Sequence, residues 1–353
     1  MSYTISPAAV DAPSDAPGHA VELRFTDGVT RSLRVPQGVN VLEAGLVADM
    51  PLLHQCRSGS CLSCIATLAS GTTIQRAGGS TLLRSEYEAG QRLLCQTEPQ
   101  GACTFDLAYT SIAGAEQPRK ALALVDEVER LAPNVVRLKL ELAEGQCLSF
   151  KSGQFVQIAI PGTDGVFRSY SPASTPEALP SLEFLIRLLP GGAMSAWLTD
   201  QANRDDVVAI EGPFGAFFLR EKVRAPHIMV AGGTGLAPIL SIIDSLRAQS
   251  GRKPRILLSF GCANADSLFA LDDIALRCQW LPTLETRISV DQGGTPWLTG
   301  NPVDTLRDDD AADPDTVAYL CGPPPMVDAA YRRLEAIGVR PANIFAEQFV
   351  ASN

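Results

Sequence analysis

The chain has 353 residues, 46% of them hydrophobic and 19% charged, which suits two or three globular domains with apolar cores. Its net charge of −10 argues against nucleic acid as a ligand, because phosphate binding needs a basic face. Residues 1–18 have neither the basic start nor the apolar stretch of a secretory signal, and no apolar run approaches the roughly 20 residues of a membrane helix. We expect a cytoplasmic protein with a flexible tail at 1–18.

Residues 19–112 are expected to form the first domain. Strand-like segments flank an Asp-Gly turn at 27–28, which is typical of a β-hairpin, and 41–48 has the pattern of a short helix. A loop that carries cysteines follows, and after it come short expected strands at 65–68 and 92–95.

Two further domains follow a linker that we expect at 113–120. Residues 121–219 contain short strands broken by glycine and proline, which is typical of a small antiparallel barrel. These strands are expected at 135–142, 154–160, 182–188 and 206–210. Residues 220–353 alternate strands with helices, which indicates a parallel sheet covered by helices. The strands there are expected at 227–231, 255–260, 286–290 and 316–320, with a helix at 238–249 after the first.

Four cysteines have the C-x4-C-x2-C spacing, with a later fourth cysteine, that is typical of a plant-type [2Fe-2S] ferredoxin. The predicted ligands are Cys56, Cys61, Cys64 and Cys95. Three thiolates on one tight loop can wrap two irons, and a fourth from a later strand closes the cage. Gly59 and Ser60 are small, so backbone amides between the cysteines can point at the sulfides.

A zinc site and a thioredoxin-like redox pair are the alternatives for these cysteines. Zinc ribbons usually carry two C-x2-C pairs, and Cys95 has no such partner. A redox pair at Cys61 and Cys64 leaves Cys56 and Cys95 without a role. His54 would suit a Rieske ligand, but the sequence offers no second Cys/His pair.

Arg168, Tyr170 and Ser171 lie where a barrel strand should end, and they match the needs of a flavin. A flavin takes a cation for its pyrophosphate, an aromatic face to stack on and a hydroxyl near its reactive nitrogen. The period of two in a strand puts Arg168 and Tyr170 on one face. Downstream, Gly192 precedes a helical stretch whose exposed amides suit a phosphate. The alternative is a surface strand with an extended arginine and a core tyrosine.

Two turns after strands of the expected parallel sheet predict a nucleotide site. The first turn contains Gly232, Gly233, Thr234, Gly235 and Pro238, and the second contains Cys321, Gly322 and Pro323. Glycines permit a tight turn, and the start of the following helix attracts a pyrophosphate. Two such turns side by side form a crevice at the carboxyl edge of the sheet. The alternative for Cys321 is a small buried residue that ends its strand.

The end of the second parallel strand favours NADH over NADPH. Residues 261–266 contain no arginine or lysine for a 2′-phosphate, and Asp266 would repel one. Arg277 could reverse this preference by folding back toward the site.

The order of these three sites resembles the reductase components of aromatic-ring-hydroxylating (Rieske) dioxygenases, most of all those for benzoate and anthranilate. The resemblance covers nearly the whole chain after the tail. It rests on the cysteine spacing and on motifs at 25–31, 168–171, 194–195, 212–215, 232–238, 321–323, 341–343 and 347–349.

The resemblance implies a multi-domain α+β and α/β protein. Its expected parts are a plant-type [2Fe-2S] ferredoxin domain with the β-grasp fold, an antiparallel FAD-binding barrel and a Rossmann-like nicotinamide domain, as in ferredoxin reductases. It further implies an oxidoreductase that passes electrons from NADH through FAD and the cluster to the Rieske centre of a terminal oxygenase, which also holds a mononuclear iron.

The resemblance also implies roles for single residues. Arg168 would bind the FAD pyrophosphate, with Tyr170 and Ser171 beside the isoalloxazine. The other implied positions are Met194 and Ser195 at the FAD phosphates, Thr234 and Cys321 near the nicotinamide, Phe349 near the flavin and Glu347 close to the hydride path. The expected catalytic residues are Ser171, Cys321 and Glu347. The chain departs from the family at Leu62, often glycine, and at Gln348, commonly basic.

Two other functions fit parts of this pattern. The reductase of a di-iron monooxygenase, such as a phenol or methane hydroxylase, has the same modular order. A redox-sensing binding module would hold a flavin and a cluster without turnover, but it needs no complete nicotinamide site.

Overall fold

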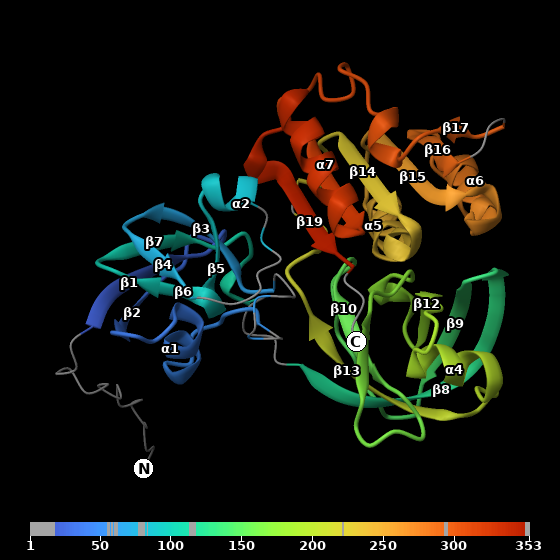
Figure 1. Ribbon diagram of the computed structural model, residues 1–353, viewed down its shortest axis with the longest axis horizontal. Coiled ribbons are helices and arrows are strands. Elements are labelled where there is room, and N and C mark those ends of the chain that lie inside the picture. The colour runs from blue at the N-terminus through green and yellow to red at the C-terminus, as the bar shows by residue number, and fades with distance from the viewer. Residues whose placement is uncertain are drawn as a thin grey trace, which may run out of the picture.

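The computed structural model describes residues 18–54, 57, 59, 63–76, 82, 84–112, 118–220, 222–292 and 296–349. Figure 1 shows three units built around separate sheets: an N-terminal unit (18–112) on the left, a barrel (119–214) at the lower right and a parallel-sheet unit (227–349) above it. Within these ranges, no helix is both long enough and apolar enough to cross a lipid bilayer.

The N-terminal unit is a mixed five-stranded sheet with the order β2-β1-β7-β3-β5. Its main elements are β1 (Gly18–Arg24), β2 (Thr30–Pro36), α1 (Val41–Val47), β3 (Ile65–Ser70), β5 (Gln91–Leu93) and β7 (Cys103–Asp106). A second small sheet pairs β4 (Thr73–Gln75) with β6 (Thr97–Pro99), and α2 (Arg84–Glu88) precedes β5. The α1 helix begins after Asn40, whose side chain accepts a hydrogen bond from the Glu43 amide and so caps the first turn.

The strand expected at 92–95 is shorter in the structure, because β5 ends at Leu93 and the chain continues as a 3-10 helix over Leu94–Gln96. The Leu94 amide donates to the Cys64 carbonyl at 3.0 Å. This bond turns the chain toward the end of the cysteine loop instead of extending the sheet.

The barrel is a six-stranded antiparallel sheet with the order β11-β10-β13-β8-β9-β12. Its elements are β8 (Arg119–Ala132), β9 (Val135–Leu142), β10 (Phe155–Ala159), β11 (Phe167–Tyr170), β12 (Ser181–Arg187), α4 (Ala193–Asp200) and β13 (Val207–Phe214). An antiparallel bridge between Pro172 and Phe184 joins the end of β11 to β12 and brings the two edges of the sheet together. Alternate side chains such as Leu138, Ile158 and Phe184 fill its interior.

The parallel-sheet unit has six parallel strands in the order β17-β16-β15-β14-β18-β19. The strands are β14 (His227–Gly232), β15 (Ile256–Asn264), β16 (Leu284–Gln292), β17 (Leu298–Thr299), β18 (Val317–Gly322) and β19 (Ile344–Gln348). The helices are α5 (Leu236–Ala248), α6 (Leu271–Trp280) and α7 (Pro324–Ala336). The order reverses between β14 and β18, which is where such sheets bind nucleotides.

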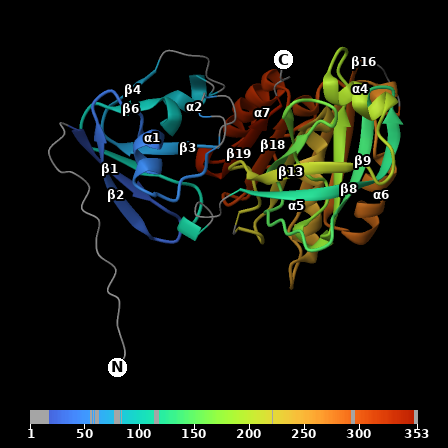
Figure 2. The same ribbon diagram turned by 90° about the horizontal axis from the view of Figure 1, so that it is seen from below.

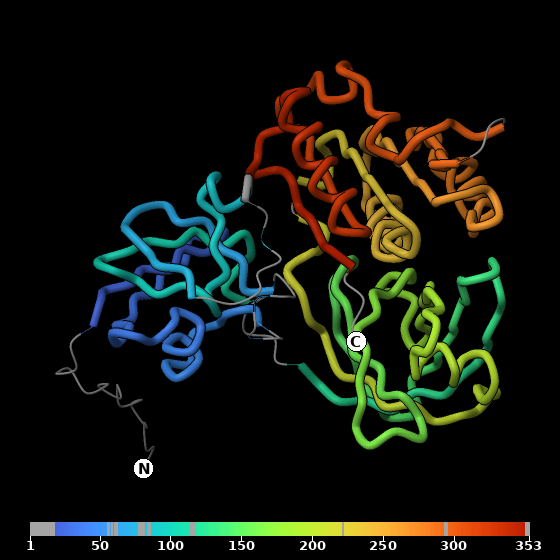
Figure 3. Tube along the Cα trace, viewed as in Figure 1, coloured from blue at the N-terminus to red at the C-terminus, as the bar shows by residue number. Residues whose placement is uncertain are grey.

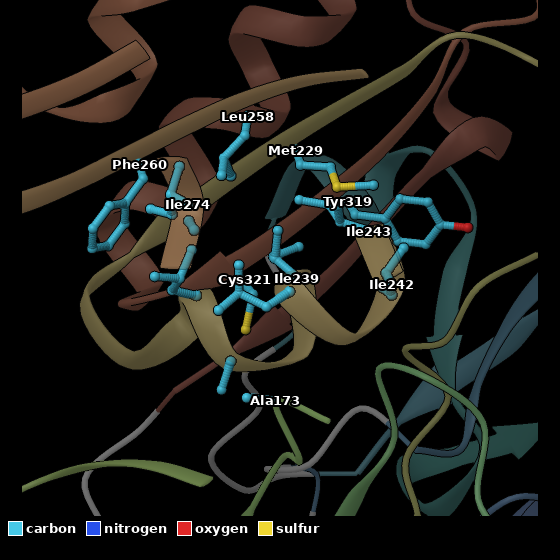
Figure 4. Close-up of a cluster of buried hydrophobic side chains, with 14 of the residues drawn as sticks. Ala173, Met229, Ile239, Ile242, Ile243, Leu258, Phe260, Ile274, Tyr319 and Cys321 are labelled. Carbon is cyan, nitrogen blue, oxygen red and sulfur yellow. The ribbon is translucent and has the colours of Figure 1, made fainter. Parts of the chain in front are cut away.

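Helices cover both faces of the parallel sheet, as the side chains of β14 show. Met229 and Ala231 belong to the core beneath α5 and α6, whereas Ile228 and Val230 belong to the core beneath α7. Figure 4 shows the first of these cores, where α5 side chains such as Ile239 meet the sheet.

The three units pack against one another. Figure 2 shows the N-terminal unit beside β19 and α7, and Figure 3 shows the chain leaving the barrel to enter the parallel sheet. Phe218, on this connecting segment, is buried in the core of the N-terminal unit. On the other side, Ser152 of the barrel and Ser245 of α5 share a buried hydrogen bond of 2.6 Å.

Candidate functional site

Cys64 and Cys95 lie next to each other in the N-terminal unit. Both are buried, and the Cys95 amide donates a hydrogen bond to the Cys64 Sγ at 3.5 Å. The 3-10 helix that follows β5 therefore places the Cys95 backbone against the Cys64 sulfur. Cys56 and Cys61, the other two predicted ligands, lie outside the described residues, as does Leu62.

Gly59 shows how closely the cysteine loop approaches this 3-10 helix. Its φ is +88°, and a Cβ on it would lie 2.1 Å from Nε2 of the Gln96 side chain. Only glycine fits such a position. The loop is therefore held close to the turn that carries Cys95, as a four-cysteine cluster site requires.

A cavity of about 890 Å³ lies between the barrel and the carboxyl ends of the parallel strands, within the range for cofactor sites of about 300–1,000 Å³. The predicted residues that line it are Arg168, Tyr170, Ser171, Gly192, Met194, Ser195, Gly232, Gly233, Thr234, Pro323, Glu347 and Phe349. The structure thus brings the predicted flavin and nicotinamide residues to one cavity. The predicted residues outside its lining are Gly235, Pro238, Cys321 and Gly322.

Strand β11 forms part of the barrel wall of the cavity. Arg168 pairs with Ile158 and Tyr170 with Val156 on the neighbouring strand, so the two residues share one face. The Arg168 guanidinium donates to the Phe167 carbonyl at 3.0 Å, and it has no carboxylate partner within the described part of the chain. Burial raises the pKa of Tyr170, and the charge of Arg168 partly offsets this effect. The strand can therefore offer a cation and a neutral phenol ring to one ligand.

The turn before α4 forms another part of the wall. Gly192 is the N-cap residue and offers no side chain, so the first amides of α4 depend on another acceptor. Met194 is buried, whereas the Ser195 hydroxyl accepts a hydrogen bond of 2.8 Å from the Leu189 amide. Ser195 therefore shapes the turn, and its hydroxyl proton remains available to a ligand.

Glycines let the two turns of the parallel sheet pack together. A Cβ on Gly235 would lie 2.2 Å from the Cys321 carbonyl oxygen, and one on Gly322 would lie 3.0 Å from the Gly232 amide nitrogen. Gly235 and Gly322 therefore shape the crevice without lining it. The helix α5 begins at Leu236, two residues before the expected start at Pro238.

Cys321 is fully buried at the end of β18. Figure 4 shows it among apolar side chains, with Ala173 of the barrel nearby. Burial raises the pKa of its thiol well above the ordinary value, and the nearby Glu347 carboxyl adds to this rise. The thiol is therefore neutral and acts in this structure as a small apolar side chain.

Glu347 lies on β19 and its carboxyl reaches the end of the barrel strand β11. The Ser171 hydroxyl donates a hydrogen bond to Glu347 Oε2 at 3.3 Å. Burial raises the pKa of Glu347 to about 8, although the bond from Ser171 lowers it. Phe349 follows β19, and its amide donates a hydrogen bond of 2.8 Å to the Gly322 carbonyl. This bond connects the residue after β19 to the second turn.

Several cavity residues were not predicted from the sequence. They are Phe155, Cys262, Ser267, Phe269, Asp291, Asn301 and Pro302. Cys262 and Asp291 lie near the carboxyl ends of β15 and β16, and this position in a parallel sheet is the signal that could have identified them. Asp266 lies in an exposed 3-10 helix and does not line the cavity.

Three family models match the chain, one for each unit. They are a 2Fe-2S iron-sulfur cluster binding domain at 25–100, an oxidoreductase FAD-binding domain at 122–219 and an oxidoreductase NAD-binding domain at 229–332. Their order is that of the three sheets.

Proteins of oxygenase systems match over nearly the whole length. The toluate 1,2-dioxygenase electron transfer component of Pseudomonas putida is 32% identical, and the match covers 95% of this chain and 99% of that one. The xylene/toluene monooxygenase electron transfer component of the same species is 33% identical, with 90% of each chain covered.

A solved structure agrees with these matches. A cytochrome reductase from Amycolatopsis is 30% identical, with a TM-score of 0.68 and 94% of this chain and 98% of that one covered. The ferredoxin reductase in carbazole 1,9a-dioxygenase, at 24% identity and a TM-score of 0.63, shares the fold. The chain therefore belongs to the family of iron–sulfur flavoprotein oxidoreductases that are electron transfer components of oxygenase systems, with FAD, NAD and a [2Fe-2S] cluster as cofactors.

Proposed function

We propose that this protein carries electrons from NADH, through FAD and the [2Fe-2S] cluster, to the Rieske centre of an aromatic-ring-hydroxylating dioxygenase that also holds a mononuclear iron. The observation that carries the proposal is the cavity between the barrel and the nucleotide-binding edge of the parallel sheet. The N-terminal unit of the same chain places Cys64 and Cys95 next to each other. Matches to the toluate and anthranilate 1,2-dioxygenase components support this partner. The reduced nicotinamide and the cysteine ligands suit a cytoplasmic location.

The barrel side of the cavity is assigned to FAD. Arg168 pairs with its pyrophosphate, Tyr170 and Ser171 flank the isoalloxazine, and the turn at Gly192 receives phosphate. The lack of a carboxylate partner for Arg168 in the described residues supports its role. Met194 and Ser195 hold the shape of the phosphate turn, through burial and through the bond to Leu189.

The sheet side of the cavity is assigned to the nicotinamide nucleotide. The turn of Gly232, Gly233 and Thr234 and the second turn at Pro323 face the same cavity, which supports this assignment. Gly235, Cys321 and Gly322 act behind them by fixing the spacing of the turns. Pro238 is buried in the first turn of α5. Phe349 covers the site next to the flavin.

The bound FAD and cluster supply the two-electron and one-electron redox chemistry. The residues of the chain bind, orient and shield the reacting groups. Glu347 keeps a proton on its buried carboxyl at neutral pH, because its pKa lies near 8. The Ser171 hydroxyl holds that carboxyl in place at the boundary between the barrel and the sheet.

NADH rather than NADPH is the proposed donor. Arg277, which could have paired with a 2′-phosphate, instead holds Asp244 with its Nη2 atom at 2.6 Å from Oδ2. Asp291 lines the cavity at the end of β16, where it would repel such a phosphate.

We further propose that the cluster domain spans 19–112, the FAD domain 121–219 and the nicotinamide domain 220–353, with a linker at 113–120. The three main sheets, one in each unit, support this division. The start of β8 at Arg119 suggests a slightly shorter linker.

The reductase of a di-iron monooxygenase is the second candidate. Matches to the xylene/toluene monooxygenase component and to propane 2-monooxygenase reductases favour it. Purified protein with NADH should be tested against a benzoate-type dioxygenase and a phenol-type hydroxylase under equal conditions. The proposal expects faster reduction of the dioxygenase, and preferential turnover with the hydroxylase would replace it with the second candidate.

A redox-sensing module is the remaining alternative, and it would not turn over. Many cycles of NADH oxidation per flavin in the presence of an artificial acceptor would exclude it. A single stoichiometric reduction without turnover would favour it.

A further inference from the structure

Arg220 lies where the three units meet. It follows β13 on the segment that leads to the parallel sheet, and its Cζ atom lies 3.8 Å from the Phe218 ring centroid and 4.6 Å from the Phe345 ring centroid. Phe218 is part of the core of the N-terminal unit, and Phe345 lies on β19. The guanidinium therefore contacts two aromatic rings, one packed into the core of the N-terminal unit and one on β19.

The charge of Arg220 is not neutralised by any acidic partner in the described part of the chain. Its Nη2 donates to the Ala216 carbonyl, and its backbone amide donates to the Tyr319 hydroxyl at 2.8 Å. The Nε and Nη1 atoms are inaccessible to solvent and have no hydrogen-bond partner among the residues that the structure describes. A buried cation in this state is costly unless an anion stabilises it.

The core that buries Phe218 also contains Tyr109, Cys64 and Cys95, and the two cysteines are predicted cluster ligands. Tyr109, buried in the N-terminal unit, lies within electrostatic range of both Arg220 and Cys64. Its hydroxyl also accepts a hydrogen bond of 3.1 Å from the Leu53 amide, on the stretch that leads into the cysteine loop. A second cation, Lys151, lies over the same Phe218 ring at 4.9 Å. Two cations, Arg220 and Lys151, thus lie over a ring that is buried in the core with Cys64 and Cys95.

We propose that Arg220 is a positioning residue whose buried positive charge stabilises the reduced [2Fe-2S] cluster and so raises its reduction potential. This inference rests on the proposed function, because it requires the cluster. An added electron increases the negative charge of a thiolate-bound cluster, and a fixed cation in a poorly solvated junction favours that state. Burial lowers the pKa of Arg220 only to about 10, so the residue keeps its charge at neutral pH.

A purely structural role is the alternative for Arg220, since a planar cation between two rings also joins the units. The two roles differ in what a change of charge does. A structural role depends on the shape and stacking of the side chain, whereas the electrostatic role depends on the charge. Lysine keeps the charge without the planar group, and methionine keeps much of the length without the charge.

The test is a potentiometric titration of the cluster, followed by electron paramagnetic resonance, in the full-length holoprotein. Removing one buried unit charge near the cluster should change its one-electron equilibrium constant roughly tenfold, or about 59 mV. We expect Arg220→Met to lower the cluster potential by this order and Arg220→Lys to restore most of it. If Arg220→Met does not fold, Arg220→Gln takes its place, and its cluster potential should fall by the same order.

Arg224→Gln is the matched control, because it removes an equal charge from an exposed position on the same segment. Its cluster potential should equal that of the wild type. An unchanged potential in Arg220→Met and Arg220→Gln, with the cluster present, would overturn the assignment and leave the proposed function standing. Wild-type protein without a [2Fe-2S] signal would overturn both.

Discussion

The hydroxyl of Ser171 donates a hydrogen bond to Glu347 Oε2 at 3.3 Å, across 176 positions of sequence. Ser171 follows the last residue of β11 in the barrel, and Glu347 lies on the final strand of the parallel sheet. Each unit alone presents only half of this contact. The cavity that we assign to FAD and NADH is therefore a product of the packing of two units.

Glu347→Gln should remove a pH dependence of stability. The folded protein keeps the carboxyl proton up to a pKa near 8, whereas the unfolded chain loses it near 4.5. Stability should therefore fall as pH rises from about 4.5 to 8, by about 2 kcal/mol between pH 6 and 8. Denaturant unfolding of the flavin-free protein at these two pH values measures the fall. Glu347→Gln should not show this fall in stability, whereas the exposed-site control Glu335→Gln should show it as the wild type does. Equal pH dependence in wild type and Glu347→Gln would contradict the burial of this carboxyl.

Arg168→Ala should weaken FAD binding. The guanidinium is the one cation that β11 offers to the cavity, and a charge-assisted hydrogen bond contributes about 1.5–3 kcal/mol, or roughly 10- to 150-fold in affinity. Equilibrium binding of FAD to deflavinated protein measures the loss. Arg204→Ala, which removes an exposed arginine from the same barrel, should bind FAD as the wild type does. A full FAD affinity in Arg168→Ala would refute the assigned role.

Gly235→Ala should push the two nucleotide turns apart. The new Cβ would lie 2.2 Å from the Cys321 carbonyl oxygen, a backbone atom that cannot move away without shifting β18. We expect a loss of about 1–3 kcal/mol in stability and weaker NADH binding. Gly101→Ala has open space around its Cβ and serves as the control. Thermal unfolding and NADH titration of both variants decide the matter, and identical behaviour would show that the turns do not need this contact.

His227 should make the parallel sheet sensitive to acid. Its ring is buried and stacks on Tyr319 with centroids 6.0 Å apart, and neither ring nitrogen has a hydrogen-bond partner in the described residues. Burial lowers its pKa from 6.5 to about 4, although the Ala225 backbone lies close enough to raise it slightly. The unfolded chain therefore binds a proton first, and stability falls as pH drops from about 6.5 to 4, by up to about 3 kcal/mol.

Hydrogen exchange of the β14 amides between pH 6.5 and 4.5 measures this loss locally, once intrinsic exchange rates are corrected. His227→Phe should remove the acid sensitivity, and His19→Gln should leave it unchanged. The same slope in His227→Phe and wild type would assign the effect to other groups.

The parts of the fold that depend on local signals could be predicted from the sequence. The turn at 27–28, the helix at 41–48 and the strand at 227–231 each have a clear pattern, and the structure contains an element at each place. The long strand β8 was not singled out, because bulges near Val125 and Arg130 break its alternation and charged residues crowd its second half. Local patterning cannot reveal a strand that is fixed by its partners.

Some residues of the site could likewise be predicted from local sequence patterns, and others could not. Arg168 and Tyr170 could be predicted from strand alternation, and the glycine turns from their composition. Asn301 could not, because it reaches the cavity from the start of a 3-10 helix whose neighbours are set by sheet order. The burial of Cys321 follows from the contact of two turns that are 86 positions apart, Gly235 and Cys321.

The most direct test of the central claim is anaerobic addition of NADH to the purified protein and to Cys56→Ser, with flavin absorption and electron paramagnetic resonance recorded together. In the wild type, the flavin band should bleach and the signal of a reduced [2Fe-2S] cluster should rise. Cys56→Ser should lose the cluster signal and cytochrome c reduction while it keeps flavin bleaching and ferricyanide reduction. Zinc in place of iron, absence of flavin, or equal loss of both activities in the variant would contradict the account.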